Sequence, residues 1–404
     1  MKFCWLLIFV VCAGCTRTPD VDPAIVGALA RIKAIDNHAH PVRPVMASEA
    51  PDLGYDALPV ENLEASSDPV RFRPARPEYA EARKIMAGTD PASVLDKAGI
   101  DKMIANRVTM GAGLPQERFL WAGYVDALMY PFPTAALALN SDRKAFFSLE
   151  DKLLVEYLKQ AGMASPPATL DPYLSKVVTA TLERHRREGA VAEKFEMAYL
   201  RTLAIRNPSK AEAEKAWRGG GAEYRLLQDY IFRYIAAECG RLGMAVHIHT
   251  GMGAGGYYDS AGANPVLLEP LFNDPALRKT NFVMLHGGWP YSKELAPLLE
   301  KPNAYVDVSL LGLALPPSEI AQTLRTWLEF VPEKVLFGTD AYPYAPSANM
   351  GWQESAYVSS QNARRALGMA LTGMVREGSV SQKRAIEIGG LVLRGNAAKL
   401  YGLK

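Results

Sequence analysis

Five of the six histidines lie in three short apolar stretches of this chain, and each stretch turns polar towards its end. The stretches cover residues 35–41, 245–251 and 282–287, and a fourth stretch, residues 335–340, ends in Asp340. Each stretch reads as a buried strand. Imidazole and carboxylate groups are the ligands that a catalytic zinc or a similar ion takes. The pattern therefore predicts a metal site at one end of a parallel β-barrel.

Strand-like apolar runs recur along the chain with helical segments between them, which is typical of a parallel sheet or barrel. The eight expected strands cover residues 34–40, 102–108, 119–128, 190–196, 245–250, 281–286, 304–309 and 335–340. An amphipathic helix, residues 224–239, ends at the C-cap signals Gly240 and Gly243. Residues 382–389 and 396–401 are expected as closing helices. The predicted fold is α/β, a (β/α)8 TIM-type barrel over residues 30–404.

Two long insertions interrupt the predicted barrel. Residues 41–92, approximately, are rich in Pro, Asp, Glu and aromatic residues and follow the first strand. Because this position lies over the active-site face, we expect a lid. The second insertion, about residues 131–187, has helical patterns near residues 149–161 and 172–186. We expect it to form a helical cap beside the same face.

The N-terminus has the pattern of an export signal. Lys2 precedes an apolar run over residues 3–12, and Ala13-Gly14-Cys15 follows. The run is too short to span a bilayer as a permanent helix. We expect a lipoprotein-type signal peptide over residues 1–14, a lipidated Cys15, and a tether and N-terminal segment over residues 15–29. The protein would then lie on the periplasmic side of a bacterial membrane; the alternative is a secretory signal and a soluble periplasmic protein.

The composition narrows the classes of protein to which this chain can belong. The chain has 404 residues, 49% of them hydrophobic, and a formal net charge of only +2. Lys and Arg are scattered, so the sequence predicts no nucleic-acid surface. Cys239 is the one cysteine after Cys15, which excludes an internal disulfide framework and a cysteine metal site. A metal ion must therefore be bound by nitrogen and oxygen ligands.

The ends of the first and last strands carry the first predicted metal ligands. His38 and His40 stand two residues apart, so on a strand both side chains point to the same side. Asp340 ends the last strand, which lies next to the first one once the barrel closes. We expect these three side chains to reach one ion.

The fifth and sixth strands add three histidines. His249 is nearer its strand end than His247, so we expect His249 to reach the metal. We expect His247 to be buried one layer deeper and hydrogen-bonded in the interior. His286 also faces the mouth, where it would bind a second ion or donate a hydrogen bond to a developing oxyanion.

Lys194, in the fourth strand, has three interpretations. An ammonium group that points into a barrel must be paired or altered, because an isolated buried charge is costly. It would pair with Glu196, Asp340 or a substrate carboxylate, or be carboxylated to a carbamate that bridges two metals. The third possibility is an outward side chain with its head in solvent. His185, in the charged helix end over residues 183–187, is expected at the surface.

The predicted site residues, taken in the order of the barrel strands, resemble those of the amidohydrolase superfamily of metal-dependent hydrolases. They are His38-Ala39-His40, Lys194, His249, His286 and Asp340. Residues 249–251, 264–265, 285–291, 307–309 and 338–340 are more particular and are similar to the amidohydrolase-2 branch, which includes carboxymuconate-semialdehyde decarboxylases. Residues 119–131 and 195–201 are similar to the amidohydrolase-like half of nodulin/glutamine-synthetase-like fusion proteins. The resemblance covers residues 30–404 and includes no ligase half.

The resemblance implies a divalent metal, with zinc as the expected ion, in one of two arrangements. In the single-ion arrangement, His38, His40, His249 and Asp340 hold the metal, while His286 and Lys194 act on the substrate. In the two-ion arrangement, carboxylated Lys194 bridges the ions. His38, His40 and Asp340 then hold one ion, and His249 and His286 hold the other.

The expected reaction is hydrolysis of a C–N or C–O bond in a small-molecule substrate by a metal-activated water. Asp340 would accept the water proton, and Arg201 or Lys194 would hold a substrate carboxylate. Trp289 and Tyr199 are expected as pocket walls. The alternatives are non-oxidative decarboxylation on the same barrel and a non-catalytic lipoprotein that binds a ligand.

Overall fold

The computed structural model describes residues 21–46, 48–52, 54–56, 63, 77–219, 223–344 and 349–403. Eight strands, each parallel to the next, follow one another in chain order around a barrel. They are β1 (Ala34–Ala39), β2 (Ile100–Asn106), β3 (Phe119–Tyr124), β4 (Ala190–Phe195), β5 (Ala245–His249), β6 (Phe282–Leu285), β7 (Ala304–Asp307) and β8 (Val335–Leu336). The predicted (β/α)8 TIM-type barrel and all eight of its strands are confirmed.

Backbone hydrogen bonds join the last strand region to the first. The Asn37 N–H donates to Phe337 O (2.9 Å), and the Asp340 N–H donates to His38 O (2.8 Å). The carboxylate of Asp36 accepts hydrogen bonds from the backbone N–H (3.0 Å) and hydroxyl (2.5 Å) of Thr339. This closure brings residues from the two ends of the chain to one point, as the sequence predicts.

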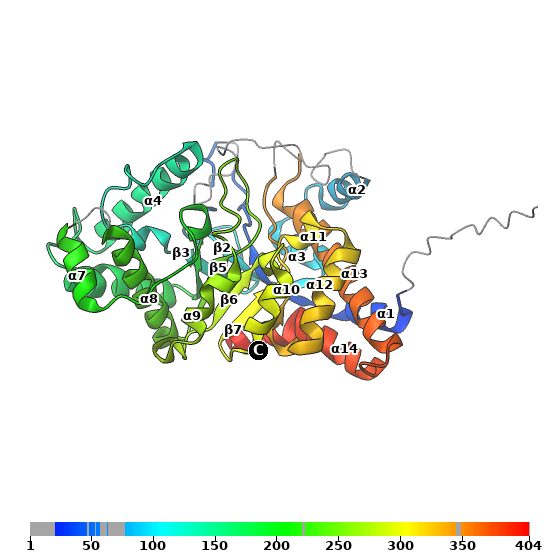
Figure 1. Cartoon of the computed structure of the whole chain (residues 1–404). Coiled ribbons are helices and arrows are strands. Elements are labelled where there is room, and N and C mark those ends of the chain that lie inside the picture. The colour runs from blue at the N-terminus through cyan, green and yellow to red at the C-terminus, as the bar shows by residue number, and fades with distance from the viewer. Residues whose placement is uncertain are drawn as a thin grey trace, which may run out of the picture.

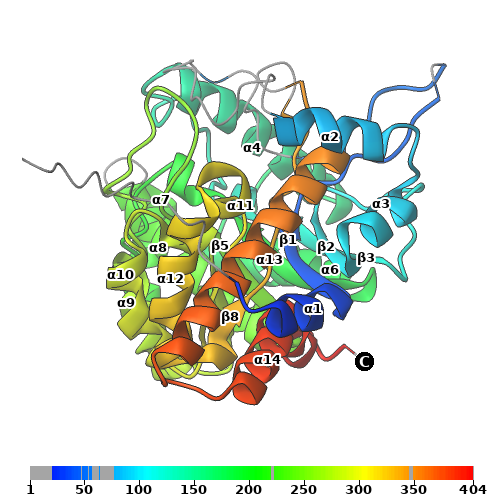
Figure 2. The same ribbon diagram turned by 90° about the vertical axis from the view of Figure 1, so that its right-hand side faces the viewer.

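Helices surround the barrel (Figures 1 and 2). The longest, α13, covers the side where β1 and β8 meet. The helices are α1 (Pro23–Arg31), α2 (Pro77–Met86), α3 (Pro91–Ala98), α4 (Ser141–Gln160), α5 (Leu170–Tyr173), α6 (Ala180–Arg187), α7 (Lys210–Gly219), α8 (Tyr224–Leu242), α9 (Glu269–Phe272), α10 (Ser292–Leu295), α11 (Leu311–Ala314), α12 (Pro317–Phe330), α13 (Trp352–Arg376), α14 (Gln382–Gly390) and α15 (Asn396–Tyr401).

The end of α8 corrects one prediction. The helix continues past the predicted end at residue 239, and Gly243, with φ of 68°, forms its left-handed C-cap. Gly240 lies inside the helix, where a Cβ atom would meet Thr280 Oγ1 at 2.5 Å. Gly240 is therefore required for close packing, whereas Gly243 ends the helix.

The two insertions lie at the same end of the barrel, where Figures 1 and 2 place α2 and α4. The second insertion contains α4, α5, a π-helical turn (Leu174–Thr179) and α6, which confirms the expected helices with longer bounds. Much of the first insertion, including residues 57–62 and 64–76, lies outside the described residues. The lid therefore stays a prediction.

The N-terminal signal peptide (residues 1–14) and Cys15 lie outside the described residues. The later part of the expected segment 15–29 is helical, because α1 begins at Pro23 and is capped by the Asp22 carboxylate. Leu29 of α1 packs against Leu371 and Gly389 of the last helices. No helix in the described ranges combines the length and apolarity needed to cross a membrane.

Candidate metal centre

Three predicted ligands converge at the carboxyl ends of β1 and β8. Asp340 Oδ1 lies 3.0 Å from His38 Nε2 and 3.3 Å from His40 Nε2. The three side chains are buried, and their ligand atoms all lie within 4.8 Å of one another. Apart from this contact with Asp340, His38 Nε2 has no hydrogen-bond partner among the described residues. Because buried polar atoms are normally satisfied, this nitrogen and its neighbours fit a metal ion as their shared partner.

The backbone is strained at two predicted site residues. Asp340 has a φ of 53° and His286 a φ of 64°, so both lie in the left-handed region that non-glycine residues rarely adopt. Such strain persists where the surrounding structure holds it, and it clusters at functional sites. The Asp36–Thr339 hydrogen bonds hold the residue directly before Asp340.

His38 is held at Nδ1 by Asn106, the last residue of β2. The Asn106 amide contacts His38 Nδ1, and Asn106 Oδ1 has no partner in the described part of the chain. A half turn of the amide lets Oδ1 accept the Nδ1 proton, which leaves Nε2 free for a metal. Burial and the positive charge of Lys194 lower the pKa of His38 well below its usual value, so the ring is neutral.

His40 is held at Nδ1 by two groups. The Tyr124 hydroxyl lies 3.0 Å from His40 Nδ1, and Asp56 Oδ2 lies 3.4 Å from it. The Tyr124 hydroxyl also donates a hydrogen bond to Asp56. Burial lowers the pKa of His40, but Asp56 and Asp340 more than offset this effect and raise the pKa to about 10. The surroundings of this imidazole thus favour a positive charge, which a metal ion supplies.

His249 and His286 lie beside the three ligands and are joined in a hydrogen-bond chain. His249 Nε2 is 3.0 Å from Met252 O, and His249 Nδ1 is 3.0 Å from His286 Nε2. His286 Nδ1 is 3.0 Å from Ser309 Oγ. Met252 O can only accept, so His249 donates through Nε2 and its Nδ1 accepts from His286 Nε2, because a neutral imidazole donates at only one nitrogen. His249 is not part of the cluster of three ligands in this structure, and its role as a ligand stays a prediction.

Lys194 is buried and pairs with Glu196. Its Nζ lies 3.4 Å from Glu196 Oε1, and both side chains are almost fully buried. The outward interpretation of Lys194 is therefore wrong, and the predicted pairing with Glu196 is confirmed. Burial and the charge of Asp56 raise the pKa of Glu196 to about 7, although Lys194 opposes the shift.

Among the predicted pocket residues, Tyr199 packs against a histidine of the site. Its ring centroid is 4.6 Å from that of His249. Trp289 is half-buried and donates through Nε1 to Glu319 Oε1 at 3.0 Å. Arg201 is buried and donates to Asp229 and Gln228, so its guanidinium is already paired within the protein. These contacts do not favour the predicted use of Arg201 for a substrate carboxylate.

The remaining two histidines give one confirmation and one correction. His247 is fully buried and bonded through Nε2 to the Tyr401 hydroxyl at 2.7 Å, as predicted. The prediction of a surface His185 is wrong. His185 is buried under the ring of Trp121, and its Nδ1 is 3.0 Å from Glu193 Oε1. A buried partner on β4 explains why a histidine in a charged helix end turns inward.

Sequence reasoning missed three residues around the ligands. Asn106 and Tyr124 end β2 and β3, so their places at the ends of barrel strands were the available signal. Asp56 lies in an irregular segment and carries no such signal. An eight-stranded barrel with a buried His–His–Asp cluster at its strand ends defines a metal-dependent TIM-barrel enzyme.

Comparison with known proteins agrees with this class. A family model for the amidohydrolases matches residues 35–403, and the chain belongs to this family. No protein of curated function matches the sequence.

Solved structures share the fold. A protein assigned as a metal-dependent hydrolase from Lactobacillus casei ATCC 334 is 17% identical, with 94% of this chain and 97% of that chain covered and a TM-score of 0.65. Glucuronate isomerase from Caulobacter crescentus is 15% identical, with 94% and 93% covered and a TM-score of 0.57. Uronate isomerase from Thermotoga maritima is 14% identical, with 80% and 72% covered and a TM-score of 0.55.

Proposed function

We propose that this amidohydrolase hydrolyses a C–N or C–O bond next to a carbonyl group in a small-molecule substrate. The observation that carries the proposal is the convergence of His38 Nε2, His40 Nε2 and Asp340 Oδ1 on one buried point. A divalent ion bound there, for which we propose zinc, supplies Lewis acidity that lowers the pKa of water from about 15.7 towards about 7.

Asp340 is the proposed proton acceptor. Its Oδ1 lies beside the imidazoles of His38 and His40, while its Oδ2 is 3.9 Å from His286 Nδ1. Burial raises the pKa of Asp340, but the neighbouring imidazoles more than offset this and hold the pKa well below its usual value. The carboxylate is therefore ionised at neutral pH, so it can accept a proton from an attacking water and pass it to the leaving group.

His286 is the proposed hydrogen-bond donor to the substrate carbonyl oxygen. Burial lowers the pKa of His286 to about 3, so the ring is a neutral imidazole. Its Nε2 faces His249 at 3.0 Å. We propose that the carbonyl oxygen replaces His249 at this nitrogen, and that His249 then turns towards the metal. A donor aimed at the oxygen where negative charge develops stabilises the transition state.

We propose one ion rather than two. The Lys194–Glu196 ion pair supports an unmodified lysine, because a carbamate at Lys194 would place two anions side by side in a buried site. Elemental analysis should give one ion per chain in the wild type and in Lys194→Met. A wild type with two ions, of which Lys194→Met loses one, would establish the bridging carbamate instead.

The reaction is tested by assay of metal-loaded protein against N-acyl amino acids, γ-glutamyl amides, lactones, aromatic carboxylates and uronates. Water-dependent cleavage of an amide or lactone, reduced at least 100-fold in Asp340→Asn, supports the proposal; losses of about this size are common for an acid–base residue. Release of CO₂ without water uptake would make the enzyme a decarboxylase. Interconversion of a uronate aldehyde and ketone would make it an isomerase, and tight binding without turnover would make it a binding protein.

We also propose that the protein is exported and anchored through a lipidated Cys15. The support is the arrangement of the first residues, with Lys2, an apolar run and Ala13-Gly14-Cys15.

A further inference from the structure

The chain turns back after the first metal-binding strand and is fastened to the end of β2 by a buried arginine. Arg107, whose exposed fraction is 1%, donates through Nη1 to Pro41 O (2.6 Å) and through Nη2 to Asp52 Oδ1 (2.9 Å). Pro41 directly follows the ligand His40. Arg107 thus holds the segment between Pro41 and Asp56 at two points with one guanidinium: at its first residue, Pro41, and at Asp52.

Backbone contacts reinforce this attachment. The N–H groups of Val108 and Thr109 both approach Gly54 O, at 3.0 and 3.3 Å. Arg107 Nε donates to Thr109 O at 3.0 Å, which fixes the arginine against the same turn. At Gly54, a Cβ atom would meet Thr109 Cγ2 at 2.7 Å. The segment therefore lies directly against residues 107–109.

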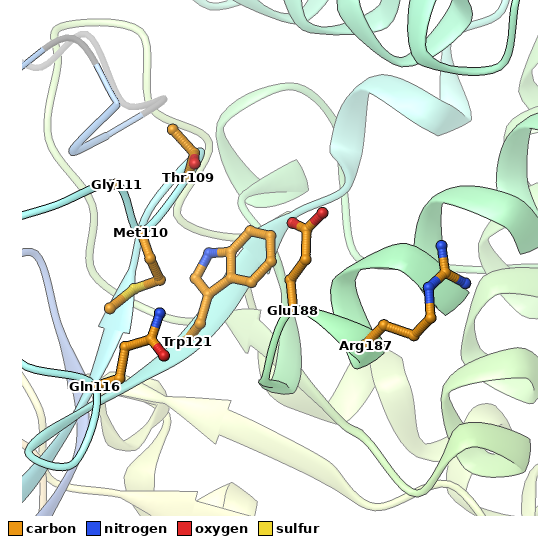
Figure 3. A pocket seen from close by; sticks show the side chains of 7 residues that line it. All are labelled: Thr109, Met110, Gly111, Gln116, Trp121, Arg187 and Glu188. Carbon is orange, nitrogen blue, oxygen red and sulfur yellow. The ribbon is translucent and has the colours of Figure 1, made fainter.

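The outer side of the attachment is also occupied. Trp121 Nε1 donates to Arg107 O at 2.9 Å. Trp121 and Thr109 line a cavity of about 380 Å³ outside the barrel, shown in Figure 3, and none of the metal ligands lines it. Arg107 is thus fixed from outside by Trp121, while its guanidinium points towards Pro41 and Asp52.

This attachment places Asp56 against a metal ligand. Asp56 stands two residues after Gly54, and its Oδ2 is 3.4 Å from His40 Nδ1, while Tyr124 donates to its other oxygen. A carboxylate on the far nitrogen of a metal-binding histidine fixes the orientation of the ring and raises its basicity. The loss of such a partner commonly weakens metal binding about 10- to 100-fold.

We propose that Arg107 is a positioning residue, which holds the segment between Pro41 and Asp56 so that the Asp56 carboxylate orients His40 for metal binding. The inference rests on the proposed metal centre. The hydrogen bonds of Arg107 go to Pro41 O, Asp52 and Thr109 O and not to the side chain of a metal ligand. Two routes lead from Arg107 to His40, the backbone at Pro41 and the carboxylate of Asp56, and the inference is that the second route carries its effect.

The test is a double-mutant cycle read by metal affinity. Zn²⁺ dissociation constants are measured by competition with a chromophoric chelator for the wild type, Arg107→Gln, Asp56→Asn and the double variant. Each single change should weaken Zn²⁺ binding about 10- to 100-fold. The double variant should bind no more weakly than Asp56→Asn alone, because Arg107 acts through Asp56. The absorption spectrum of the Co²⁺-loaded protein should change in the same three variants.

Arg118→Gln is the matched control. Arg118 sits on the same connection between β2 and β3 and also donates to two backbone carbonyls, Asp101 O (2.6 Å) and Ile100 O (3.1 Å), and to a carboxylate, Asp96 Oδ1 (3.1 Å). It does so at the opposite end of β2 from the metal ligands. This variant should lower the melting temperature but leave Zn²⁺ affinity unchanged.

Unchanged Zn²⁺ affinity in Arg107→Gln, or effects of Arg107→Gln and Asp56→Asn that simply add, would overturn the inference and leave the metal centre intact. If Arg107→Gln does not fold, Asp52→Asn removes the same ion pair and is judged by the same outcomes. A wild-type protein that binds neither Zn²⁺ nor Co²⁺ would overturn the proposed metal centre itself, which is a different result.

Discussion

His38 in β1 and His40 directly after it present Nε2 to the metal position because other residues occupy Nδ1. Asn106 holds His38, whereas Tyr124 and Asp56 hold His40. Which nitrogen binds a metal is decided by the hydrogen bond that the other nitrogen makes. The metal site is therefore built as much by β2 and β3 as by the ligands of β1.

This arrangement predicts that Asn106→Leu weakens Zn²⁺ binding about 10- to 100-fold, because His38 loses the group that fixes its ring. Zn²⁺ affinity by chelator competition checks this. Asn303→Leu is the control: Asn303 is also a buried asparagine whose amide donates to a backbone carbonyl, Leu277 O (3.2 Å). The control should lose stability but keep its Zn²⁺ affinity; equal losses of affinity in both variants would contradict the prediction.

Single residues show how far the sequence could lead. The spacing of His38 and His40 was enough to predict a shared direction, since side chains on a strand alternate with a period of two. The partners of Arg201 and His185 were out of reach, because they lie on other elements and depend on tertiary packing. Arg201 is neutralised by Asp229 on a neighbouring helix, and His185 is drawn inward by Glu193.

A buried acid next to Lys194 gives a pH prediction. Asp126 Oδ2 accepts the N–H of Glu196 at 2.8 Å, and Oδ1 has no partner in the described residues. Burial, together with the charge of Glu196, raises the pKa of Asp126 to about 8. In the unfolded chain its pKa is about 3.9, so between these values the folded protein holds the extra proton.

The stability that protonated Asp126 contributes is therefore complete below about pH 3.9. It falls by up to about 1.4 kcal/mol per pH unit above that value and is lost once the pH has risen through about 8. Asp126→Asn keeps an oxygen for the Glu196 N–H and cannot ionise. Its free energy of unfolding, from urea denaturation, should exceed that of the wild type at pH 9 and match it more closely at pH 5. An equal difference at both pH values would contradict the raised pKa.

At the scale of elements, strands were easier to predict than their ends. The predicted last strand covers residues 335–340, but β8 contains only two residues. The strand ends at Leu336, and Asp340 adopts a left-handed backbone that no strand accommodates. Likewise, His286 lies beyond β6 with a positive φ. The site residues depart from strand geometry because they turn towards the mouth of the barrel.

The close approach of Gly54 to the end of β2 predicts a steric effect. Gly54→Ala places a Cβ atom 2.7 Å from Thr109 Cγ2, so one of the two segments must shift. We expect a loss of about 1–3 kcal/mol of stability together with weaker Zn²⁺ binding. Thr109→Ser removes the Cγ2 atom, so the double variant Gly54→Ala/Thr109→Ser should recover most of both losses. Thermal unfolding and chelator competition measure them, and a double variant no better than Gly54→Ala would count against this contact.

At the scale of the whole molecule, the first described residues are fixed to the last helices. The Asp22 N–H donates to Thr372 Oγ1 at 3.1 Å, and Gln382 Nε2 donates to Asp22 Oδ2 at 2.7 Å. Arg364 of α13 donates to Leu29 O at 2.7 Å. In Figure 2, α1 lies beside α14, at the end of the barrel away from α2 and α4. The chain therefore enters the barrel on the side opposite to the insertions.

If Cys15 is lipidated as proposed, this attachment limits how far the barrel can stand from the membrane. Asp22 comes seven residues after Cys15, and a fully extended chain of that length reaches about 25 Å.

Cys15→Ser should move the protein from the membrane fraction to the soluble periplasmic fraction. Its melting temperature and metal content should match those of the anchored protein, because the hydrogen bonds of Asp22 to the last helices do not depend on the residues before it. Cys239→Ser is the control, since this thiol is buried on α8 and should not affect fractionation. Membrane association that persists in Cys15→Ser would remove the proposed anchor, whereas a fall in melting temperature would show that the N-terminal residues stabilise the fold.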